Sequence, residues 1–257
     1  MTSLRERFKR FMRSTPSVED IDDLVRPRES ELVGRKRADF LAYDRRVVVE
    51  TKSLEVDPVD KIQRFLDGLA QSGRLPKTGD MALAELLRDL PDGQALYDEL
   101  LARVTKVFDD NIARADDQTR DTKWIFNIPQ ATGVVVMLNE NAALLYPDQA
   151  LLRIFDTLRN KLPDGKPRYV HNHVVIYISE AHRVDAGEGV TMYDMATIYS
   201  DAGNAIPFAT TFAEDLNKRW AAFNDAGYLE SSDHWDNFRP RNPVKPFTVI
   251  RPPPIKQ

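Results

Sequence analysis

The chain has 257 residues, 42% of them hydrophobic, so it can build one large domain or two small ones around a core. It carries 36 basic and 40 acidic residues, and this balance gives no general support for nucleic-acid binding, which would need a local basic surface. The absence of cysteine excludes disulfides, thiolate zinc sites and a cysteine nucleophile.

The N-terminal segment is basic but lacks the apolar core of a signal peptide. No apolar run approaches the ~20 residues that span a bilayer, so we expect a cytoplasmic protein without a membrane partner. Residues 4–13 place Leu4, Phe8 and Phe11 at helical spacing among basic residues. This helix either docks its phenylalanines on the core or forms an amphipathic arm for a phosphate backbone or a membrane surface.

The hydrophobic patterns predict a mixed α/β chain. A short helix is expected over residues 17–25, with Ser17 as its N-cap. Residues 36–42 and 47–54 form the two strands of a hairpin, and Asp57 followed by Pro58 begins a helix. The further predicted elements are helices over 81–90, 94–124, 147–162 and 208–226, and strands over 132–139, 169–179 and 247–250. Residues 186–206 carry no pattern that assigns them.

Three charged residues of the hairpin stand where a buried strand would carry apolar ones: Asp39, Glu50 and Lys52. Residues two apart in a strand share a face, so Glu50 and Lys52 project together with Val48. If the hairpin turns near residues 44–45, Asp39 falls almost opposite Glu50.

Two carboxylates placed in this way repel each other unless a divalent cation lies between them, and oxygen ligands favour magnesium or manganese. Asp39 and Glu50 are therefore the candidate metal ligands, and the backbone carbonyl of Thr51 would point into the same space. Lys52 could orient or deprotonate a metal-bound water, or neutralise charge developing on a phosphate.

Asp39 followed by Glu50-Thr51-Lys52 on an apolar strand resembles the D…ExK signature of the PD-(D/E)XK nuclease superfamily. Ala38 stands where that family usually has proline. The resemblance implies a single domain over residues 1–257, in which a mixed central sheet is flanked by helices. Its α-β-β-β-α-β core would cover about 17–140, with a helical insertion at about 57–110 and a C-terminal extension at about 141–257.

Some branches of the superfamily carry a glutamine or lysine on the helix after the ExK strand. Gln118 and Lys123 resemble that feature, because they lie in unusually polar last turns of the helix predicted over 94–124. Gln118 then joins Asp39, Glu50 and Lys52 as a catalytic candidate. The alternative for both residues is a solvated helix end.

The function implied by the resemblance is magnesium-dependent hydrolysis of phosphodiester bonds, with DNA as the expected partner and homodimerisation as a possibility. A basic rim beside the site is expected from Arg35, Lys36, Arg37, Arg45 and Arg46. Two alternatives stay open. The chain could be an inactive nuclease-fold module for nucleic-acid binding or assembly, or an unrelated α/β protein in which the three charges form a surface ion pair.

His171 and His173 are two apart and would share a face of the strand predicted over 169–179. A second metal site is conceivable there, since imidazole suits zinc. The alternative is that both side chains face solvent or form hydrogen bonds at a sheet edge.

Overall fold

The computed structural model describes residues 2–25, 34–55, 57–75, 87, 90–187 and 190–228, with side chains left undescribed over 183–194. The chain divides into two compact units. The first comprises Met1–Val56 with Val107–Glu230, and the second comprises Asp57–Lys106 with Ser231–Gln257. Every predicted site residue belongs to the first unit.

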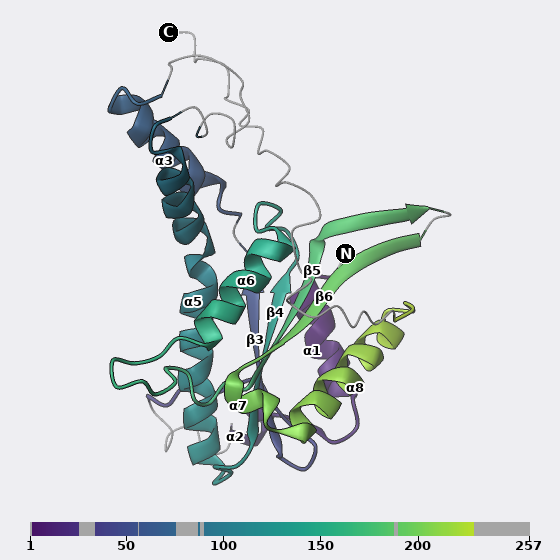
Figure 1. The fold of residues 1–257 in the computed structure, drawn as a ribbon. Coiled ribbons are helices and arrows are strands. Elements are labelled where there is room, and N and C mark those ends of the chain that lie inside the picture. Colours follow the sequence, from purple (N-terminus) through teal and green to yellow (C-terminus); the bar gives the residue numbers. More distant parts are fainter. Residues whose placement is uncertain are drawn as a thin grey trace. The chain divides into compact units, whose positions relative to one another are not determined.

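Within the described residues, the first unit is built on a six-stranded mixed sheet whose strand order follows the chain (Figure 1). The central pairs β3–β4 and β4–β5 are parallel, and the remaining pairs are antiparallel. Parallel neighbours need a long connection, and α6 supplies it between β4 and β5. The strands are β1 (Val18–Asp20), β2 (Phe40–Ala42), β3 (Val47–Leu54), β4 (Thr132–Asn139), β5 (Val174–Gly187) and β6 (Val190–Tyr199).

Two helices, α1 (Leu4–Ser14) and α8 (Pro207–Phe223), cover one face of this sheet. Phe8 and Phe11 of α1 each lie 5.3 Å, between ring centroids, from Trp220 of α8. All three rings are buried. The prediction that the N-terminal helix docks its phenylalanines on the core is therefore confirmed.

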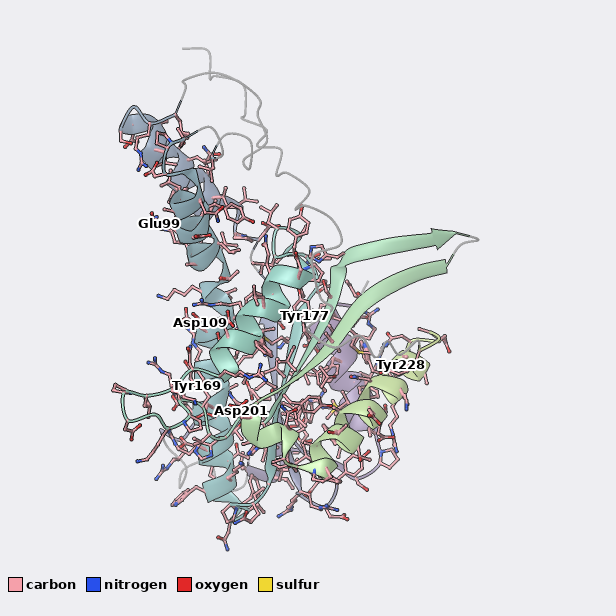
Figure 2. The ribbon with its side chains drawn as sticks, in the orientation of Figure 1. Glu99, Asp109, Tyr169, Tyr177, Asp201 and Tyr228 are labelled. Carbon is pink, nitrogen blue, oxygen red and sulfur yellow. The ribbon has the colours of Figure 1, made fainter. Side chains whose placement is uncertain are left out.

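The opposite face carries α2 (Ile21–Val25), α6 (Pro147–Leu158) and the later turns of α5 (Gly93–Ile125). Asp109 of α5, labelled in Figure 2, accepts a 2.8 Å hydrogen bond from Nε of Arg153 on α6, which ties these two helices together. Val48 faces the α2 side, so Glu50 and Lys52 face that side too. A short helix, α7 (Asp201–Asn204), precedes α8.

The prediction of one helix over residues 17–25 is wrong in its first part. Residues 18–20 pair with β2 as strand β1, and Ser17 has a φ of 62°. The helix begins only at Ile21, and Oδ1 of Asp20 accepts the N–H of Asp22 at 3.0 Å. Pairing with β2 has overridden the local capping signal, as tertiary context commonly does.

The strand predicted over 169–179 begins later and runs further, as β5. Residues 171–173 lie before it in a loop, because Oδ1 of Asp116 on α5 accepts the N–H groups of His171 and Asn172 at 2.8 and 3.1 Å. β4 pairs with β5 only as far as Ser179, and β5 continues beyond that point with β6 alone. The sheet therefore continues into the region predicted as a C-terminal extension.

The second unit contains α3 (Val59–Gln71) and the first turns of α5. Oδ1 of Asp57 accepts the N–H of Val59 at 3.2 Å, so this helix begins where Asp57 and Pro58 predicted. Its apolar side is buried as expected, through Ile62, Phe65, Leu66 and Leu69. The predicted strand at 247–250 and most of the predicted helix at 81–90 lie outside the described residues.

None of the helices in the described ranges combines the length and the hydropathy needed to cross a bilayer.

Candidate active site

The β2–β3 hairpin carries the three charged residues that the sequence singled out. Phe40 pairs with Val49, which brings Asp39 level with Glu50 just before β2 begins. The N–H of Asp39 donates to the carbonyl of Val49 at 3.1 Å. Residues 43–45 form the turn with φ values between 52° and 63°. The predicted hairpin and its register are confirmed.

The carboxylate of Asp39 is held by Thr51. Its Oδ2 accepts the N–H of Thr51 at 2.8 Å and also the Thr51 hydroxyl. Its Oδ1 accepts no hydrogen bond from the described residues and has Nζ of Lys9, on α1, at 3.9 Å. The N–H and carbonyl of one strand residue leave on the same side, so the carbonyl of Thr51 also points past the beginning of β2.

Glu50 is the buried member of the set, with 3% of its surface exposed. Its Oε1 accepts Nζ of Lys52 at 2.7 Å, and its Oε2 is buried without a hydrogen-bond partner among the described residues. Burial, with a smaller contribution from the charge of Asp39, raises the pKa of Glu50 to about 7, and Lys52 and Gln118 only partly offset this. An acid of this kind is costly to keep ionised without a further cation.

Gln118 of α5 meets Lys52 from the facing helix. Its Oε1 accepts Nζ of Lys52, and its Nε2 donates to the carbonyl of Arg37 at 2.7 Å. Glu50 and Gln118 together hold the ammonium group, whose side chain is 14% exposed. This contact agrees with the expectation that Gln118 points at the site. The catalytic role of Gln118 stays a prediction.

No family model matches the chain, nor does any curated protein or solved structure. The geometry of this site is therefore the basis for assigning a function to the chain.

The polar last turns of α5 fix the segment that leads into β2. Besides the Gln118 contact with Arg37, Oγ1 of Thr122 accepts the N–H of Ala38 at 2.9 Å. The backbone directly before Asp39 is thus bonded to α5. This explains why a long helix ends in polar residues, and it shows how α5 positions the hairpin.

Lys123 lies beside a different group of residues from Gln118. It is 7% exposed, and burial lowers its pKa to about 8, opposed by the charge of Asp116. His171 and His173 lie in the same neighbourhood, and burial lowers the pKa of His173 to about 4. Nδ1 of His173 accepts the N–H of Gly133 at 2.8 Å, so this ring is a structural contact with β4.

Within the described ranges, no three His, Cys, Asp or Glu side chains are grouped so as to hold a metal ion. This gives no support to the zinc site considered for His171 and His173. It also means that a cation at Asp39 and Glu50 would have two carboxylates at most. Magnesium commonly binds through one or two carboxylates and keeps several waters.

Each residue of the predicted basic rim makes a contact within the chain. Arg45 forms an ion pair with Glu19 at 2.7 Å, and Lys36 forms one with Asp117 at the same distance. Arg46 stacks on Phe208. Arg35 stacks on Trp124, and Arg37 lies 4.0 Å from Asp22. A phosphate backbone binding here would have to displace or share these contacts.

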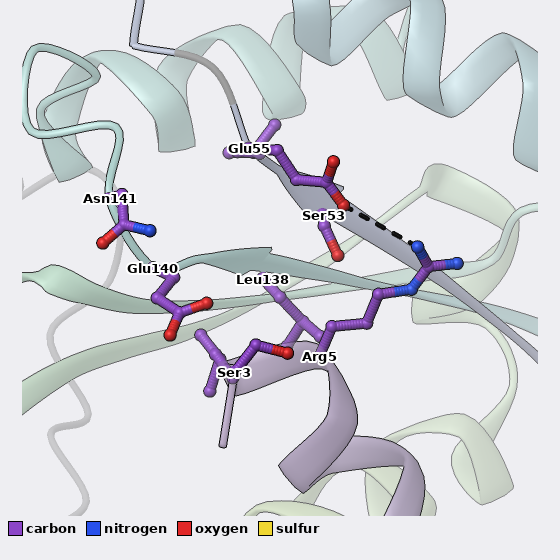
Figure 3. Close-up of a pocket in the computed structure, with 9 residues that line it drawn as sticks. Ser3, Arg5, Ser53, Glu55, Leu138, Glu140 and Asn141 are labelled. Atoms are coloured by element: carbon purple, nitrogen blue, oxygen red, sulfur yellow. Dashed lines mark ion pairs between the residues drawn. The ribbon is translucent and has the colours of Figure 1, made fainter. Parts of the chain in front are cut away.

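A small pocket of about 150 Å³ lies beyond the site along β3 (Figure 3). Its walls include Arg5 at the start of α1, Glu55 after β3 and Glu140 after β4. Arg5 pairs with Glu55 at 3.7 Å. Two carboxylates against one guanidinium make this pocket unsuited to a phosphate group.

Lys9 is the residue at the site that the sequence did not indicate. It lies 30 positions before Asp39 on a helix whose pattern shows only an apolar side and a basic side. Its approach to Asp39 depends on how α1 packs on the sheet.

Proposed function

We propose that the protein is a metal-dependent nuclease that hydrolyses phosphodiester bonds, with DNA as the substrate. The observation that carries the proposal is the buried Glu50, whose Oε2 has no hydrogen-bond partner in the described structure and whose neighbours are Asp39 and Lys52. A surface ion pair would leave both groups in water. Here the acid is enclosed and its pKa is raised, which is typical of a functional site.

The oxygens of this site fit a magnesium or manganese ion. Asp39 Oδ1, Glu50 Oε2 and the Thr51 carbonyl are hard oxygen donors, and both carboxylate oxygens lack hydrogen bonds from the described residues. These three groups would hold the ion. When bound, such an ion polarises a phosphoryl oxygen and lowers the pKa of a water ligand.

Lys52 is the proposed catalytic cation. Its ammonium group is held between Oε1 of Glu50 and Oε1 of Gln118, so little reorganisation is needed for it to face a substrate. It would orient the attacking water or neutralise charge on the phosphate in the transition state. Gln118, which is bonded in turn to Arg37, keeps the ammonium in place.

The acidic balance of the chain and the paired rim weaken long-range attraction to DNA. We therefore expect the affinity for DNA to come from contacts within the site itself. DNA binding should fall steeply with salt only if the ion pairs of the basic rim open. Homodimerisation, which would allow both strands of a duplex to be cut, stays a prediction.

The test is cleavage of supercoiled plasmid and of single-stranded DNA in magnesium, comparing wild type with Asp39→Asn and Lys52→Ala. We expect cleavage by wild type and a loss of at least about 100-fold in each variant. Glu99→Gln is the matched control, because it removes a carboxylate that pairs with Arg103 on α5, in the compact unit that contains neither the site nor its basic rim. Absence of cleavage by wild type on DNA and RNA, in magnesium and in manganese, would remove the enzyme proposal and leave the binding-module alternative.

A further inference from the structure

Helix α1 presents three basic residues at four-residue intervals, which places them along one side of the helix. Each lies against one carboxylate of the sheet region. The pairs are Arg5 with Glu55 at 3.7 Å, Lys9 with Asp39 at 3.9 Å, and Arg13 with Asp20 at 2.7 Å.

The pair formed by Lys9 differs from the other two, because its acid is a proposed metal ligand. The separation of 3.9 Å between Nζ and Oδ1 is too long for a hydrogen bond. The contact is therefore purely electrostatic. The Lys9 and Asp39 side chains are 22% and 21% exposed, so water screens it only in part.

The oxygen that Lys9 faces is also the one that a metal ion would need. Oδ2 of Asp39 is occupied by two donors from Thr51, whereas Oδ1 accepts no hydrogen bond from the described residues and faces the ammonium of Lys9. A divalent cation on Oδ1 would lie at ~2.1 Å from that oxygen. It would then be within a few ångströms of a like charge.

We propose that Lys9 is a built-in competitor for the divalent cation: its ammonium neutralises Asp39 in the metal-free protein and lowers the affinity of the site for magnesium or manganese. This inference rests on the proposed function, since it takes Asp39 as a metal ligand. Glu50 is paired with Lys52 at 2.7 Å, so each acid of the site has one lysine near it.

The test is calorimetric titration of Mn²⁺ into the full chain at physiological ionic strength. An ion pair of this exposure contributes up to about 1 kcal/mol, which corresponds to roughly fivefold in affinity. Lys9→Gln is thus expected to lower the Kd for Mn²⁺ by about fivefold. Lys9→Arg keeps the charge and should stay near wild type.

Arg10→Gln is the matched control, because it removes one positive charge from the same helix at an exposed residue that lies over the ring of Phe223 instead of facing Asp39. We expect it to change the Kd by less than about twofold, since exposed charges are screened by salt. Thermal unfolding of each metal-free variant checks that α1 still packs.

The outcomes separate the two proposals. Tighter Mn²⁺ binding by Lys9→Gln alone supports the competition. Binding that requires Asp39 and Glu50 but is equal, or weaker, in Lys9→Gln overturns the role of Lys9 and leaves the nuclease proposal standing. If neither wild type nor Lys9→Gln binds Mn²⁺, the competition is overturned together with the metal site, and the cleavage assay decides the function.

Discussion

Replacing Glu50 by glutamine should change how the stability of the protein depends on pH. Burial raises the pKa of Glu50 from 4.5 to about 7, so the folded state holds its proton more tightly than the unfolded state does. Below pH 4.5 Glu50 is protonated in both states. Between pH 4.5 and about 7 the folded protein keeps Glu50 protonated while the unfolded chain releases that proton, so stability is lost as the pH rises.

The size of the effect follows from the two pKa values. A difference of one in pKa corresponds to about 1.4 kcal/mol, so the change from 4.5 to about 7 corresponds to about 3 kcal/mol over the whole range. Between pH 5 and pH 8 about 2–3 kcal/mol of this falls within the measured window. Glutamine does not titrate, so Glu50→Gln should gain that amount relative to wild type between these two pH values.

The assay is denaturant unfolding of both proteins at pH 5 and pH 8 in the presence of a chelator, followed by tryptophan fluorescence. Glu19→Gln is the control that should stay parallel to wild type between these two pH values, because Arg45 lowers the pKa of Glu19 and its stabilising contribution changes only below the ordinary value of 4.5. A difference between Glu50→Gln and wild type that does not change with pH would refute the description of Glu50 as a buried, unpaired acid.

Four further substitutions test other parts of the structure. Lys52→Ala should abolish cleavage while Mn²⁺ binding persists in calorimetry, and unchanged cleavage would remove Lys52 from the mechanism. Gly133→Ala should destabilise the fold strongly in thermal unfolding, because a Cβ there would lie 1.8 Å from the carbonyl oxygen of His171. Gly68→Ala, with nothing within 4 Å, should instead stabilise α3 by up to about 1 kcal/mol. Phe8→Ala should cost about 3–5 kcal/mol in denaturant unfolding, and a loss below about 1 kcal/mol would contradict the packing of α1.

The hairpin could be predicted because its information is local. The run Val47–Val49 and the alternation after it indicate a strand, and the spacing of Asp39 from Glu50 sets the register across a short turn. The polar last turns of α5 also indicated a contact with the site. Polar side chains such as Gln118 on a packed helix need hydrogen-bond partners, and here these are Lys52 and the carbonyl of Arg37.

Other features depend on contacts that no local pattern contains. Val18–Asp20 became a strand because β2 offered an edge to pair with. His171 was kept out of β5 by its bond to Asp116, which is 55 positions away. Lys9 reaches Asp39 only because Phe8 and Phe11 dock α1 on the sheet. Such tertiary contacts override local secondary-structure propensity, so the spacing of residues in the sequence does not predict them.

Asp39 and Glu50 are proposed to share one divalent cation. Anomalous diffraction from crystals of the protein soaked in Mn²⁺ tests this directly. We expect an anomalous peak at about 2 Å from Asp39 Oδ1, Glu50 Oε2 and the Thr51 carbonyl, with the ammonium of Lys9 moved away from Asp39. A peak elsewhere, or none at saturating Mn²⁺ with Lys9 still against Asp39, would contradict it.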